Sequence, residues 1–100
     1  MNAAEKRQHV AKAIVGAHAA LRGIRPTNPR DLHAQVEILA AVVYAARDTF
    51  GHNESECMLA PLLDAFRDNA RALKMEAQAS KQLALAIKKA SAPRNRRMPR

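Results

Sequence analysis

Three asparagines, each three positions before an acidic residue, constrain the fold of this chain more than any other feature of its sequence. The pattern occurs at residues 2–5, 28–31 and 53–56. An asparagine side chain at an N-cap accepts a hydrogen bond from a free backbone N–H, and an acid at N3 favours the positive end of the helix. The pattern therefore predicts three helices that begin at these points.

Glycine and proline indicate where the predicted helices end or bend. Gly23 and Gly51 follow the first two helical patterns, and glycine readily adopts the left-handed turn after a helix. The predicted helices span about residues 3–22, 29–50 and 57–90. Pro61 lies near the start of the third helix, and its ring removes a backbone hydrogen bond. Either residues 54–59 form a separate short turn or the helix is kinked near residues 57–61, and we expect a short helix followed by a kink. No sustained alternation of apolar and polar residues predicts a strand.

The apolar residues of each predicted helix recur in alternating steps of four and three, which is the spacing of left-handed helix packing. We therefore predict an all-α fold, a three-helix antiparallel bundle within residues 1–90. The third helix should project beyond the other two, because each residue adds about 1.5 Å to its length. Leu83 and Ile87 continue its apolar stripe along the projecting half. A second copy of the chain, a different protein or an anionic surface could cover them, and we expect these two residues to form an interface, with a homodimer as the favoured case.

Length and composition are consistent with one small domain. The chain has 100 residues, a single-domain length. Hydrophobic residues make up 48% of it but aromatic residues only 3%, so we expect a thin core that favours oligomerisation or a bound partner. The single cysteine, Cys57, cannot form an internal disulfide. No apolar run approaches about 18 residues and no secretory signal is evident, so we expect a cytoplasmic location.

Catalytic and metal-binding patterns are missing from the sequence. The histidines at positions 9, 18, 33 and 52 include no pair three or four residues apart, so no helix face offers two of them to a metal. Asp64 and Asp68 share a helix face, but an arginine follows each by three residues, which indicates surface ion pairs. Cys57 has no base near it in the sequence. We therefore expect no cofactor, no metal and no enzymatic activity.

The basic residues are concentrated at the two ends of the chain. The net charge is +8, although residues 31–80 contain eight acids and only four basic residues. From residue 81 onward the chain has no acid and seven basic residues: Lys81, Lys88, Lys89, Arg94, Arg96, Arg97 and Arg100. Prolines and like charges predict that residues 91–100 form a disordered basic tail. Such a segment indicates binding to phosphate, with a solubilising terminus or an acidic protein partner as alternatives.

Two functional hypotheses follow. The first is a non-enzymatic, dimeric helical module that binds the phosphate backbone of nucleic acid without sequence specificity. The connection at residues 23–30 is longer than the turn of a helix-turn-helix motif, and aromatic residues are too few for a stacking platform. The alternative is an accessory or inhibitor protein, encoded by a phage or plasmid, that docks through protein–protein contacts on a host complex handling nucleic acid. Neither hypothesis involves a membrane or a small-molecule substrate.

Overall fold

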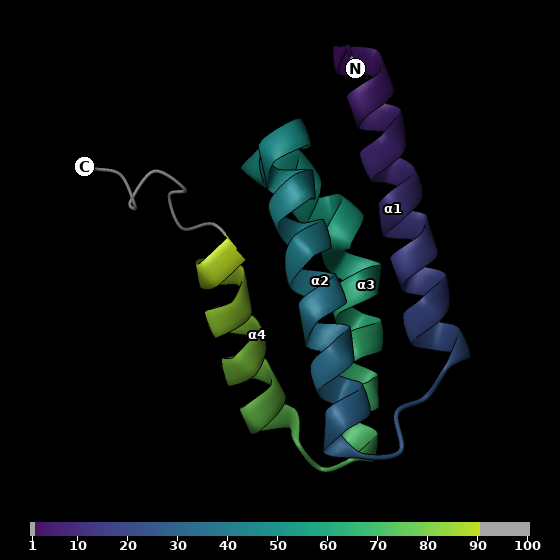
Figure 1. The fold of residues 1–100 in the computed structure, drawn as a ribbon, viewed down its shortest axis with the longest axis vertical. Coiled ribbons are helices and arrows are strands. Elements are labelled where there is room, and N and C mark those ends of the chain that lie inside the picture. The colour runs from purple at the N-terminus through teal and green to yellow at the C-terminus, as the bar shows by residue number, and fades with distance from the viewer. Residues whose placement is uncertain (1, 91–100) are drawn as a thin grey trace, which may run out of the picture.

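The computed structural model describes residues 2–90, and this part of the chain contains four α-helices (Figure 1). They are α1 (Ala3–Gly23), α2 (Pro29–Phe50), α3 (His52–Ala72) and α4 (Glu76–Ala90). Successive helices run in opposite directions, and no strand occurs among the described residues. The all-α prediction is confirmed. The predicted number of helices is wrong, because α3 and α4 replace the single long third helix. The predicted tail, residues 91–100, lies outside the described residues.

Helices α1 and α2 begin at two of the asparagine motifs. Asn2 Oδ1 accepts a hydrogen bond from the backbone N–H of Glu5 at 2.8 Å, and Glu5 Oε1 accepts one from the backbone N–H of Asn2 at 3.0 Å. Asn28 Oδ1 accepts one from the backbone N–H of Asp31 at 3.0 Å. Pro29 occupies the first turn of α2, where its missing N–H costs nothing. These bonds satisfy backbone donors that have no partner within the helix.

The third asparagine motif does not cap a helix, contrary to the prediction. Helix α3 begins at His52, so Asn53 lies inside its first turn, and no side chain caps this end. Gly51 alone separates α2 from α3 and has a φ of 84°, a left-handed conformation that a side chain disfavours. The tight reversal at Gly51 therefore sets the start of α3.

Pro61 does not interrupt α3, which runs without a break from His52 to Ala72. The proline cannot donate a hydrogen bond to the carbonyl of Cys57, one turn earlier. Pro61 and Cys57 are both exposed, so water can reach the carbonyl that lacks a partner in the helix. The position of Pro61 on the solvent side explains why the helix tolerates it.

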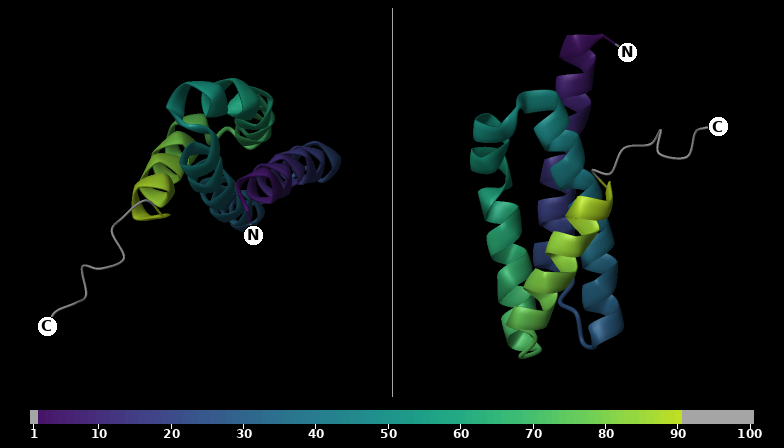
Figure 2. Two further views of the ribbon diagram at one scale, coloured as in Figure 1. Left: turned by 90° about the horizontal axis from the view of Figure 1, so that it is seen from above. Right: turned by 90° about the vertical axis from the view of Figure 1, so that its left-hand side faces the viewer.

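The chain turns back at Leu73–Met75, where the sequence predicted continuous helix. Lys74 has a φ of 58°. The backbone N–H of Met75 donates to the Ala70 carbonyl at 2.9 Å, and that of Lys74 donates to the Arg71 carbonyl at 3.0 Å. This pair of bonds is the Schellman turn, in which glycine usually occupies the left-handed position. The turn sends α4 back along the bundle, beside α2 and α3 (Figure 2).

Helix α2 lies at the centre of the molecule and contacts each of the other three helices. In Figure 1 it faces the viewer, α3 lies behind it, and α1 and α4 flank it on opposite sides without contacting each other. The buried apolar core draws on all four helices and consists of Val10, Ile14, Ala17, Leu21, Leu32, Val36, Leu39, Val43, Ala46, Leu59, Leu62, Ala65, Phe66, Ala70, Ala79 and Leu83.

Leu83 and Ile87 lie against the core of their own chain. Leu83 is only 9% exposed, and Ile87 is half-buried and packs against the core cluster. Because α4 folds back onto α2 and α3, it does not project beyond the bundle. The overhang from which the homodimer interface at these residues was predicted is therefore absent.

Two buried amide side chains connect α1, α2 and α3 through three hydrogen bonds. Asn69 of α3 is 5% exposed, and its Nδ2 donates to the Leu21 carbonyl at 3.0 Å and to Gln35 Oε1 at 3.1 Å. Gln35 of α2 donates through Nε2 to the Ile24 carbonyl at 3.4 Å. Carbonyls at a helix C-terminus have no donor within the helix, so the two amides satisfy the end of α1. The network fixes the position of this end relative to α2 and α3.

Candidate functional site

Helix α4 carries three exposed lysines, Lys81, Lys88 and Lys89, which we call its basic face. Lys81 and Lys88 lie on the same side of the helix, since seven residues make about two turns. Lys89 borders the groove between α4 and α2. Among the described residues, none of the three lysines has an ion pair or hydrogen-bond partner. Three positive charges are thus available to a ligand.

The packing of α4 explains why these lysines point to solvent. Ala79 and Leu83 form the buried side of the helix, and they are 1% and 9% exposed. Lys81 and Lys88 lie on the other side, together with Leu85, which is 63% exposed. Lys88 and Lys89 are in the last turn, where the negative end of the helix dipole stabilises positive charge.

Four of the nine acidic residues pair with a lysine or arginine away from the basic face. Their closest basic partners lie within ion-pair distance: Asp48 with Lys6 at 2.9 Å, Asp64 with Arg67 at 3.2 Å, Asp68 with Arg71 at 3.7 Å, and Glu76 with Arg71 at 3.1 Å. The pairs on α3 follow the three-residue spacing noted in the sequence. Glu76 is the acid of α4, and it is directed to Arg71 on α3. The basic face therefore has no acidic neighbour on its own helix.

The remaining predicted phosphate-binding residues, Arg94, Arg96, Arg97 and Arg100, lie outside the described residues. The chain enters this segment directly after Ala90, the last residue of α4. The four arginines therefore follow the basic face along the chain, with no acidic residue between them.

The basic residues of α1 do not belong to the basic face of α4. Lys6 pairs with Asp48, and the guanidinium of Arg7 lies 5.6 Å from the centre of the Phe50 ring, so both contact the end of α2. Helix α1 lies on the opposite side of α2 from α4 (Figure 2). The two basic segments of the sequence are thus separated by the central helix.

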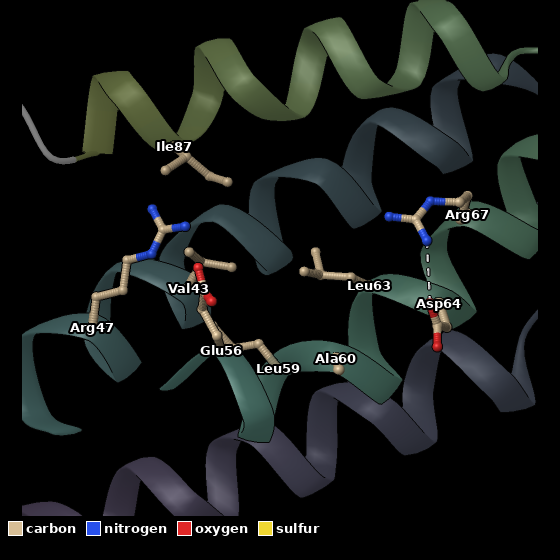
Figure 3. A pocket seen from close by; sticks show the side chains of 9 residues that line it. All are labelled: Val43, Arg47, Glu56, Leu59, Ala60, Leu63, Asp64, Arg67 and Ile87. Carbon is tan, nitrogen blue, oxygen red and sulfur yellow. Dashed lines mark hydrogen bonds and ion pairs between the residues drawn. The ribbon is translucent and has the colours of Figure 1, made fainter. Parts of the chain in front are cut away.

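A groove of about 280 Å³ lies between α2, α3 and α4 (Figure 3). Val43, Leu59 and Leu63 line its apolar side, and Ile87 reaches toward them from α4. The polar side chains around it are Arg47, Glu56, Asp64 and Arg67. Sequence reasoning did not find this groove, because it exists only where α4 folds back over α3.

Two of the histidines considered as metal ligands lie beside glutamates on the surface of the protein. His33 Nε2 lies 3.6 Å from Glu37 Oε2, and His52 Nε2 lies 2.9 Å from Glu56 Oε2, all on exposed helix surfaces. Within residues 2–90 no group of three or more histidine, cysteine or acidic side chains is placed to hold a metal ion. Over the same range, no helix combines the length and apolar character needed to cross a membrane.

Comparisons of the chain with protein families, with curated proteins and with solved structures gave no match. The function must therefore be argued from the residues themselves, and the basic face of α4 is the part of the described surface with the clearest chemical character.

Proposed function

We propose that this chain is a small, non-enzymatic basic module that binds the phosphate backbone of nucleic acid without sequence preference. The basic face of α4 supplies the contacts from the folded part, and the arginines of residues 91–100 extend them. One observation carries the proposal: Lys81, Lys88 and Lys89 are exposed, without partners among the described residues and without an acidic neighbour on α4.

The spacing of the lysines suits a nucleic-acid strand. At about 1.5 Å per residue, Lys81 and Lys88 are roughly 10 Å apart along α4, which is comparable to the rise of about three base-pair steps along a duplex axis at about 3.4 Å per step. Each phosphate that a lysine neutralises releases counterions, so binding should weaken strongly as salt rises. Contacts of this kind carry no information about base sequence, which explains the lack of sequence preference in the proposal.

The proposal is tested by removing the basic face from the full chain. The variant Lys81→Gln, Lys88→Gln, Lys89→Gln should bind a fluorescent DNA duplex more weakly than the unsubstituted chain in an anisotropy titration. With about 0.9 per neutralised phosphate, three lost contacts should reduce the slope of log affinity against log salt by roughly 3. The loss of affinity should be equal for duplexes of unrelated sequence.

A charge-matched control distinguishes this face from general attraction. Lys12, Arg22 and Arg25 are exposed residues of α1 and the segment after it, across α2 from the basic face. Their replacement by glutamine removes the same net charge and should change the salt slope much less. Equal losses in both variants, or no binding by the unsubstituted chain, would contradict the proposal.

A second candidate is a docking protein that acts on a complex handling nucleic acid, and the groove between α2, α3 and α4 favours it. The groove combines an apolar side at Leu63 and Ile87 with charged residues around it, a composition found at protein interfaces. Ala60 is exposed within the groove, so Ala60→Arg should block docking there while leaving DNA binding unchanged. Loss of DNA binding in Ala60→Arg would instead place the groove within the nucleic-acid surface.

A further inference from the structure

The outward side of α2 carries a second apolar stripe, most of which is exposed to solvent. Ala34, Ile38, Ala41 and Ala45 follow each other in steps of four, three and four, so they lie along one side of the helix. Ile38 is 48% exposed, Ala34 and Ala41 are exposed, and Ala45 is partly exposed. In Figure 1, α3 lies behind α2, and α1 and α4 lie at its flanks. We call these four residues the outer stripe.

The outer stripe is flanked by opposite charges at its two ends. Arg30 lies one turn before Ala34 and Asp48 lies one turn after Ala45, so both continue the same side of the helix. Arg30 is exposed and has no partner among the described residues. Asp48 is exposed and holds Lys6 at 2.9 Å through Oδ2. The face thus runs from a positive end, across apolar residues, to a negative end.

We propose that this face binds a second copy of the same chain, with the two α2 helices antiparallel. In that arrangement Arg30 of each copy meets Asp48 of the other, and both ends of the stripe are paired. Ile38 of each copy then packs over Ala41 of the other, and Ala34 over Ala45. A parallel arrangement would place Arg30 against Arg30 and Asp48 against Asp48, which is unfavourable. The charge distribution therefore selects both the partner and its direction.

The side chains of the stripe suit contact between two helices. Three of its four members are alanine, and small side chains allow helix axes to approach closely. The steps of four and three are those of packed helical pairs. The same face repeats on each copy, so the contact closes on itself by a twofold axis and does not propagate into a filament.

The proposed dimer has a consequence for the basic face of α4. When two such faces meet with their α2 helices antiparallel, the twofold axis lies between them and perpendicular to α2. Helix α4 of each copy then lies along the same edge of the dimer. Lys89 of the basic face borders the same groove as Ala41 of the outer stripe, so the proposed interface lies next to the basic face. The dimer is a separate inference from nucleic-acid binding and can be tested without nucleic acid.

Sedimentation equilibrium of the full chain, without nucleic acid, tests the proposal. The unsubstituted chain should have the mass of a dimer, and Ala41→Arg should have the mass of a monomer, because it places two like charges at the centre of the contact. Ala19→Arg makes the same change at an exposed alanine of α1 and should leave the dimer intact. Circular dichroism should show the same helical content for all three proteins.

Exchange of the charges at the two ends of the outer stripe, Arg30 and Asp48, tests the antiparallel direction. Arg30→Glu alone should weaken the dimer, since it sets two acids against each other. Arg30→Glu with Asp48→Lys should restore it when Lys6→Glu is added, because Lys6 pairs with Asp48 within each chain and would otherwise repel the new lysine. A monomeric unsubstituted chain would overturn the proposal, as would a dimer that survives Ala41→Arg or that Ala19→Arg also dissociates. Failure of this charge exchange, with the Lys6→Glu change included, to restore the dimer would overturn the antiparallel arrangement.

Discussion

Replacement of Lys74 by glycine should stabilise the protein, because this residue ends α3 in a backbone conformation that suits glycine. Lys74 has a φ of 58°, and for a residue with a side chain the left-handed region costs roughly 1–2 kcal/mol. Its side chain is exposed and forms no ion pair among the described residues. Glycine removes the strain but makes the unfolded chain more flexible, which costs about 0.4–1 kcal/mol. The net gain should be about 0.5–1 kcal/mol in the free energy of unfolding.

Urea denaturation followed by circular dichroism measures this change, with an unaltered dependence on denaturant as the sign that the folded state is the same. Lys74→Ala is the matched control, since it removes the same side chain but keeps the strain, and it should bring no gain. The difference in stability between Lys74→Gly and Lys74→Ala distinguishes a turn at this residue from a continuous helix. In a continuous third helix, glycine at an interior position would destabilise by about 1 kcal/mol relative to alanine. A Lys74→Gly variant less stable than Lys74→Ala would therefore refute the turn at this residue.

Three further predictions concern the core, the amide network and the end of the chain. Phe66 is 4% exposed, so Phe66→Ala should lower the free energy of unfolding by about 3–5 kcal/mol in urea titrations. Asn69→Ala should lower the free energy of unfolding by about 1–3 kcal/mol, because it leaves Gln35 and the Leu21 carbonyl without their donor. Asn53→Ala is the control, since Asn53 is exposed on α3 and caps no helix, and it should lower the free energy of unfolding by less than about 0.5 kcal/mol. Deletion of residues 93–100 should reduce the salt slope of DNA binding by roughly 3–4, and equal binding by the shortened chain would exclude these arginines from the contact.

The first two helices could be predicted from the sequence because their signals are local. The motifs at residues 2–5 and 28–31 place an asparagine and an acid where a helix start needs them, and both form the expected cap bonds. Val10, Ile14 and Leu21 follow the apolar spacing of four and three residues in the first predicted helix, and all three are buried. In these segments the local preferences and the tertiary packing favour the same structure.

The end of α3 could not be predicted in the same way, because its cause is tertiary. Residues 71–77 contain neither glycine nor proline and consist largely of good helix formers, so nothing local stops the helix. The left-handed turn at Lys74 is retained because it allows α4 to bury Ala79 and Leu83 against the rest of the chain. The position of the groove beside Ile87 depends on the same turn, and this is why sequence reasoning missed it.

The turn at Lys74 also determines which side of the last helix becomes basic. Eighteen residues make about five full turns, so in an unbroken helix Lys88 would point in the same direction as Ala70, which is buried in the core. Leu83 would point roughly 140° away from Ala70, so the apolar stripe predicted through Leu83 would have drifted off the core side of a straight helix. An unbroken helix would therefore place a lysine in line with the core and leave a leucine outside it. The turn reverses both outcomes, because α4 can rotate relative to α3, bury Leu83 and expose Lys81 and Lys88. Packing of the apolar residues and presentation of the basic face are thus two results of one break in the helix.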